Sequence, residues 1–168
     1  MASEILAFDR HDRRSFPNET WRWIHTWRFS LLAPWASDRQ ILREMLDDEH
    51  YPYSFVTPYP ETRKWGPKVR GPYYLDKLSP GSFSPITSEV AWDQLDGFLR
   101  DGIHPASRSD LDLNNLLGET IDTADALFQL QEYVTIRHDE PVAPADWGEL
   151  VAIDRKSQLL LDIARGFD

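Results

Sequence analysis

ETWRWIHTWRFSLL, residues 19–32, holds three of the seven tryptophans in the chain, and the assignment of its structure determines the predicted fold class. Trp23, Trp27 and Leu31 recur at the spacing of one face of a helix, and Asn18 just before the stretch is a good helix N-cap. The pattern predicts a helix over the whole stretch. Because aromatic side chains cover most of its circumference, we expect the rest of the domain to wrap around it.

Outward from this stretch, the same periodicity predicts further helices over residues 37–48, 88–102, 109–118, 120–134 and 146–165. Residues 5–8 form a short apolar stretch that fits a strand or a first helical turn. No internal repeat or linker divides the chain. The predicted fold is therefore mainly α, a single compact domain (residues 1–168) of about five or six helices.

Residues 51–85 differ in amino-acid composition from the rest of the chain. They contain five of the six tyrosines, seven of the twelve prolines and a local net charge of +3, from five basic and two acidic side chains. Prolines at this density exclude a helix. Short extended pieces at residues 54–57 and 73–75 are compatible with a small β element, so we expect an irregular Tyr/Pro-rich insert.

The charge balance limits the function classes. The chain has 168 residues and a net charge of −10, and residues 86–168 carry 17 acidic against 6 basic side chains. Nucleic-acid binding needs a basic face, and an anionic membrane would repel this chain. There is no cysteine, no signal-like leader and no apolar run of membrane-spanning length. These features predict a soluble, cytoplasmic protein.

No motif for catalysis, metal binding or cofactor binding is present, so we expect no cofactor. Three of the five histidines stand beside acids, among them His50 and His138, but none has the spacing of a metal site or an acid–base pair on one helical face. Without cysteine no thiol nucleophile exists, and no glycine-rich phosphate loop occurs. The sequence leaves open whether the fold brings His50 and His138 together.

One basic cluster, residues 63–70 (RKWGPKVR), mixes cations with a tryptophan, as single-stranded nucleic-acid channels do. Such a short cluster in an acidic chain is a weak signal for nucleic acid. We expect its cations to pair with the acidic half of the same domain, or with an acidic patch on a partner.

These features favour a non-catalytic acidic protein-binding module that docks on a basic partner protein. The profile is typical of small inhibitors such as immunity proteins, by type and not by sequence match. One candidate surface is an acidic face made of Asp110, Asp112, Glu119, Asp122 and Asp125. The other is the aromatic insert with Tyr51, Tyr53, Tyr59, Trp65, Tyr73 and Tyr74, whose residue types dominate interface hot spots unless the rings lie on the helices as a lid.

Two alternatives stay open from the sequence. The first is a hydrolase or lyase whose histidine and carboxylate groups are assembled only by the fold. The second is a structural or assembly subunit, which would form obligate oligomers. The identity of the partner, the biological pathway and the oligomeric state are not encoded in any feature that we recognise.

Overall fold

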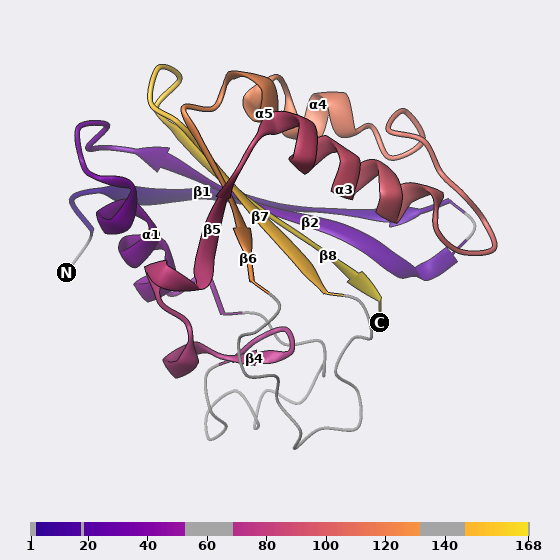
Figure 1. Ribbon diagram of the computed structural model, residues 1–168, viewed down its shortest axis with the longest axis horizontal. Coiled ribbons are helices and arrows are strands. Elements are labelled where there is room, and N and C mark those ends of the chain that lie inside the picture. The colour runs from indigo at the N-terminus through magenta and orange to yellow at the C-terminus, as the bar shows by residue number, and fades with distance from the viewer. Residues whose placement is uncertain (1–2, 18, 53–68, 132–146, 168) are drawn as a thin grey trace.

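The centre of the molecule is a six-stranded antiparallel sheet with the strand order β1-β2-β8-β7-β6-β5 (Figure 1). The computed structural model describes residues 3–17, 19–52, 69–131 and 147–167. The strands of this sheet are β1 (Leu6–Phe16), β2 (Glu19–Leu31), β5 (Phe83–Ile86), β6 (Ala126–Leu130), β7 (Gly148–Asp154) and β8 (Leu159–Phe167). A separate two-stranded ladder pairs β3 (Val69–Arg70) with β4 (Tyr73–Tyr74).

Helices cover the sheet on both faces (Figure 1). One face carries α1 (Asp38–Asp47), and the other carries α3 (Ser88–Arg100), α4 (Leu113–Leu117) and α5 (Thr120–Thr123). Two short 3₁₀ turns, η1 (Leu75–Lys77) and η2 (Pro80–Ser82), lead from β4 into β5. The described part is thus three layers, with a hydrophobic cluster on either side of the sheet.

The predicted mainly α fold is wrong, and the error begins in residues 19–32. This stretch is β2, which pairs with β1 on one side and β8 on the other. Trp23, Trp27 and Phe29 all point to the α1 face, while Ile24 points to the opposite face. Aromatic and β-branched residues favour such a strand. The side chains that seemed to cover a whole helix instead cover both faces of a strand within the sheet.

Two more predicted helices are strands for the same reason. Of the helix predicted over residues 120–134, the described part forms the four-residue α5 and then β6; where a helix was predicted over residues 146–165, the described part forms β7 and most of β8. The apolar runs 150–153 and 159–161 are buried on both faces of the sheet. A short, continuously apolar run suits a fully buried strand as well as a helix, so its periodicity does not separate the two.

Three other helical predictions are confirmed, one of them in part. α1 begins after Ser37, whose side chain accepts from the backbone of Gln40 in a capping box. α3 follows Thr87, whose side chain accepts a hydrogen bond from the backbone N–H of Val90. The short helix predicted over residues 109–118 is present only as α4. The small β element of the insert is confirmed at β4, whereas residues 54–57 and the predicted N-cap Asn18 lie outside the described residues.

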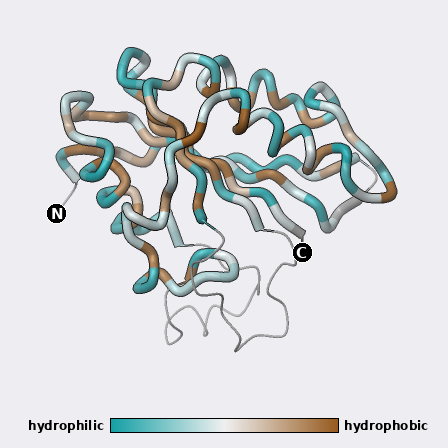
Figure 2. The backbone as a smooth tube through the Cα atoms, viewed as in Figure 1, coloured by the Kyte–Doolittle hydropathy of each residue, from teal (hydrophilic) through white to brown (hydrophobic). Residues whose placement is uncertain are grey.

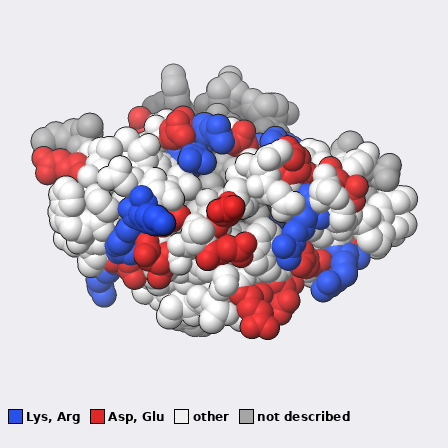
Figure 3. Space-filling view, turned by 90° about the horizontal axis from the view of Figure 1, so that it is seen from above, with Lys and Arg blue, Asp and Glu red and all other residues white. Residues whose placement is uncertain are grey.

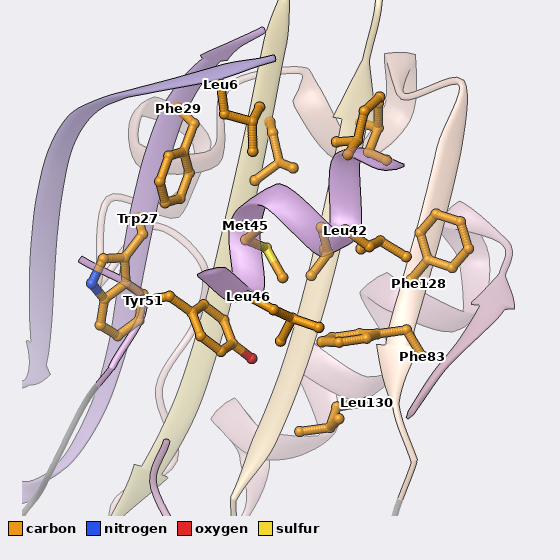
Figure 4. Close-up of a cluster of buried hydrophobic side chains, with 14 of the residues drawn as sticks. Leu6, Trp27, Phe29, Leu42, Met45, Leu46, Tyr51, Phe83, Phe128 and Leu130 are labelled. Carbon is orange, nitrogen blue, oxygen red and sulfur yellow. The ribbon is translucent and has the colours of Figure 1, made fainter. Parts of the chain in front are cut away.

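Hydrophobic residues concentrate where the strands pass between the helical layers (Figure 2). On the α1 face, Met45 and Leu42 of the helix pack over the sheet beside Phe29 and Phe128 (Figure 4). Each fully buried side chain of this size stabilises the fold by roughly 1.5–3 kcal/mol. At one end of this face, Tyr51 and the β3–β4 ladder cover the sheet in place of α1. The strands carry charged residues there.

Candidate functional site

Two carboxylates lie close together on the sheet, on the face that α1 partly covers. Glu149 belongs to β7 and Asp162 to β8, and the register pairs Glu149 with Ala164 and Val151 with Asp162. Both acids therefore point to the same face, in pairs that lie two positions apart along the ladder. Their side chains have no exposed area. Burying carboxylates is costly unless neighbouring groups compensate their charge.

Arg70, at the end of β3, supplies that compensation. Its Nε donates to Oε2 of Glu149 at 3.4 Å, and one terminal nitrogen donates to Oδ2 of Asp162. The other terminal nitrogen donates to the carbonyl oxygen of Tyr51 at 2.7 Å. The Tyr51 hydroxyl in turn donates to Oε1 of Glu149 at 2.7 Å. Tyr51, Arg70, Glu149 and Asp162 form one connected network, which we call the Arg70 cluster.

Aromatic rings enclose the guanidinium of Arg70. Its central carbon lies 3.8 Å from the ring centroid of Trp27 and 4.3 Å from that of Tyr51. Trp147 lies farther away, at 5.6 Å, and its indole N–H donates to Oε2 of Glu149 at 3.3 Å. Desolvated cation–π contacts of this kind add to the ion pairs and exclude water from them.

The Arg70 cluster holds one more carboxylate than it has cations. Burial raises the pKa of Asp162 well above its ordinary value, and Glu149 adds to the rise against the opposing effect of Arg70. Burial opposes the charge on Arg70, yet Asp162 and Glu149 raise its pKa, so it stays a cation. Oδ1 of Asp162 is buried and accepts no hydrogen bond from a described N–H or O–H group. Because Oδ2 already accepts from Arg70, Oδ1 is the oxygen that would carry a proton on Asp162.

A pair of histidines lies against the same tryptophan. Nε2 of His11 and Nδ1 of His25 are 2.7 Å apart, and the His11 ring stacks on Trp27. Burial lowers the pKa of His25 to about 3, with His11, Arg13 and Arg70 adding to the shift. Burial and Arg70 also lower the pKa of His11. Both rings are therefore neutral near pH 7, and one donates its proton to the other.

The Arg70 cluster is closed to solvent, which limits its chemistry. Three surface hollows that described residues line are formed without any member of the cluster. A carboxyl–carboxylate pair can store a proton, but general acid–base catalysis also needs a substrate within hydrogen-bond reach. In this conformation the arrangement fixes the insert to the sheet.

The five acids of the predicted acidic face are all exposed, in and around α4 and α5. Asp110 accepts from the backbone of Ser107, and Asp122 accepts from the indole N–H of Trp92 at 2.7 Å. Asp112 accepts from Asn115, and Asp125 from the backbone of Arg155. Glu119 lies at the start of α5. Each local hydrogen bond fixes a carboxylate without removing it from the surface.

The residues of the aromatic insert are placed differently. Tyr51 and Tyr73 are buried, and Tyr74 is half-buried. Tyr53, Tyr59 and Trp65 lie outside the described residues. Tyr51 and Tyr73 belong to the hydrophobic cluster on the α1 face of the sheet, and a partner-binding role for the insert stays a prediction.

The other titratable groups singled out from the sequence are only partly described. His50 is exposed, pairs with Asp48 at 2.9 Å and stacks on Phe8. His138 lies outside the described residues, so their convergence is untested. Of the basic cluster over residues 63–70, Arg70 pairs with two acids of the second half, as expected for that cluster.

The sequence analysis missed the roles of Glu149, Asp162 and Trp147. A signal was present, because both acids interrupt apolar runs, and an acid inside a buried strand must have a compensating partner. The partner itself has no local signal. Arg70 is 79 residues away from Glu149 in the chain and 92 from Asp162.

No family model, curated protein or solved structure matches this chain. Within the described ranges no helix is long and apolar enough to cross a bilayer. The same ranges contain no group of three or more His, Asp or Glu side chains that could hold a metal ion.

Proposed function

We propose that this protein is a non-catalytic acidic binding module that docks on the basic surface of another protein and thereby blocks it. The observation that carries the proposal is the charge of the α3–α5 side. Residues 86–131 expose eight carboxylates, whereas their only cations are Arg100 and Arg108. Arg108 is already bound to both oxygens of Asp96, at 2.8 and 2.6 Å.

Seen from above, several groups of acidic side chains lie among mostly uncharged residues near the centre of the surface, with Lys and Arg on either side (Figure 3). Such a face attracts a basic partner before contact and orients it, which raises the association rate. Because salt screens charges over roughly 8–10 Å, the effect depends on ionic strength. A basic toxin or nuclease is the kind of protein that this face would neutralise.

The test measures association kinetics against a panel of proteins with isoelectric points above about 9. The triple variant Asp101→Asn, Asp112→Asn, Glu119→Gln removes three exposed charges from this side. We expect its association rate with a bound partner to fall about tenfold at low salt, and the difference to shrink as salt rises.

A matched control removes the same number of charges elsewhere. Glu4→Gln, Asp47→Asn, Glu49→Gln changes exposed acids at the N-terminal segment and at the end of α1. Its association rate should stay close to that of the unmodified protein. The proposal is contradicted if no basic protein binds, if binding is indifferent to salt, or if both triple variants slow association equally.

A further inference from the structure

We infer that His11 and His25 form a binding site for a divalent transition metal ion, Cu²⁺, at the β1 edge of the sheet. The inference is independent of the proposed binding of a basic protein. The two histidines lie on the face of the sheet that α1 partly covers, opposite to α3, α4 and α5.

The two rings come from neighbouring strands of one ladder. β1 pairs with β2 so that His11 lies opposite Trp27 and His25 lies opposite Arg13. The histidines are therefore diagonal neighbours on the same face of the sheet. Nε2 of His11 lies 2.7 Å from Nδ1 of His25, and the ring centroids are 4.8 Å apart. The ladder between two strands, and not a loop, fixes this distance.

Tryptophan rings support both histidines. The ring of His11 stacks on Trp27 with the centroids 4.6 Å apart, and the ring of His25 meets Trp23 edge to face at 4.5 Å. His25 is buried, whereas His11 is exposed on the edge strand. His25 is therefore a ligand held in place by the sheet, and His11 offers the approach from solvent.

Both imidazoles are in the protonation state that binds metal ions at neutral pH. Metal ions coordinate neutral imidazole, and burial lowers the pKa of His25 to about 3. Burial and Arg70 also lower the pKa of His11. In the hydrogen-bonded pair one of the two facing nitrogens carries the proton. That ring must carry its N–H on its other nitrogen before both nitrogens can bind the metal, so the number of protons on the pair stays the same.

The distance between the two nitrogens favours one coordination geometry. With metal–nitrogen bonds of about 2.0 Å, ligands at 90° to each other are about 2.8 Å apart, whereas tetrahedral ligands are about 3.3 Å apart. The observed 2.7 Å matches the tetragonal arrangement of Cu²⁺ and is shorter than tetrahedral Zn²⁺ requires. Imidazole is a good ligand for Cu²⁺. The pair supplies two ligands, so water would fill the remaining positions.

The charges around the pair are compatible with a bound cation. Arg70 acts on both histidines, but the two carboxylates of the Arg70 cluster offset its charge. Arg13 is exposed, so solvent and salt screen it. Asp12 acts in the opposite direction to both arginines, since it raises the pKa of His11.

The experiment titrates the whole protein with Cu²⁺ in a buffer that does not bind metals. One readout is tryptophan fluorescence, which bound Cu²⁺ quenches and to which Trp23 and Trp27 contribute beside the site. The other is the electron paramagnetic resonance spectrum of the bound ion, whose hyperfine pattern counts the nitrogen ligands. We expect one ion per chain, two nitrogen ligands, and an affinity for Zn²⁺ at least about tenfold lower.

A variant with a matched control completes the test. His11→Gln should lower the affinity for Cu²⁺ about tenfold or more and leave at most one nitrogen ligand in the spectrum. Glutamine can still form a hydrogen bond with His25, and thermal unfolding without metal checks that the fold is retained. His50→Gln is the control, because His50 is also exposed and also stacks on an aromatic ring, that of Phe8. Its affinity for Cu²⁺ should equal that of the unmodified protein.

Three results would overturn the site. The first is an equal affinity of His11→Gln and the unmodified protein for Cu²⁺. The second is a spectrum of the unmodified protein with a single nitrogen ligand, or with several ions bound per chain at similar affinity. The third is tighter binding of Zn²⁺ than of Cu²⁺, which would contradict the geometry inferred from the distance between the nitrogens.

Discussion

Glu149 and Asp162 face a single guanidinium, and this imbalance has a measurable consequence. In the unfolded chain both acids lose their protons above about pH 4. In the folded protein the raised pKa of Asp162 keeps its proton to a higher pH. Between about pH 4 and the raised pKa of Asp162, the folded state therefore binds more protons than the unfolded state. The stability of the folded state must fall as the pH rises through this range.

We predict that Asp162 makes the free energy of unfolding decrease as the pH rises above about 4, with a slope of at most about 1.4 kcal/mol per pH unit for one proton. Asp162→Asn, which is neutral at every pH, should flatten that slope. Denaturant unfolding at a series of pH values gives the measurement. An unchanged slope in the variant would mean that Asp162 is ionised in the folded state.

His25 should produce the opposite dependence at lower pH. Its pKa falls from 6.5 to about 3 in the folded protein, so the unfolded chain binds the extra proton. Its contribution to stability is complete above about pH 6.5 and is lost as the pH falls toward 3. His25→Gln should therefore reduce the acid sensitivity of the free energy of unfolding. The exposed His50→Gln is the control, and equal effects of the two variants would disprove this assignment.

The positions of these acids show how much of the site could be predicted from the sequence. An acid within the run LLLDI (residues 159–163) predicts a buried charge with a compensating group. It does not indicate which cation compensates it, because the choice depends on a contact across 92 residues. The charge excess around α4 and α5 was readable from composition alone.

β2 shows why the predicted fold class was wrong. Residues 23, 25, 27, 29 and 31 alternate toward one face with period two, and that pattern was visible in the sequence. The apolar and aromatic residues between them hid it, because a strand inside a three-layer fold is buried on both faces. α1 and α3 were predictable since each has one polar face and a capping residue.

The turn between β3 and β4 depends on glycine. Gly71 has a φ of +53°, and a Cβ there would lie 2.7 Å from the ring of Trp147. We predict that Gly71→Ala destabilises the fold by about 2–3 kcal/mol, from left-handed backbone strain and this clash. Thermal unfolding measures the effect.

Gly97, in α3, is the matched control, because a Cβ there meets nothing within 4 Å. Gly97→Ala should stabilise the protein by about 0.5–1 kcal/mol through helix propensity. If Gly71→Ala proved as stable as the unmodified chain, the β3–β4 turn would not be tied to Trp147 as described.

The three layers predict an order of local stability. β7 and β8 lie in the middle of the sheet and contribute buried residues to the hydrophobic clusters on both faces. Opening them requires breaking both clusters, so their amide hydrogens should exchange slowest. β1 and β5, at the two edges, should exchange sooner. Hydrogen exchange read by mass spectrometry or NMR measures this order, and faster exchange in β8 than in β1 would refute it.

The edge strands also constrain how the molecule can meet others. β1 carries Arg10, Arg13 and Arg14, and β5 contains Pro85, which offers no backbone N–H for a further strand. Charges and proline at sheet edges discourage another chain from extending the sheet. A partner that does not pair with the backbone of an edge strand must be recognised through individual side chains. A few substitutions on the surface could then redirect the protein toward a different target while the scaffold stays intact.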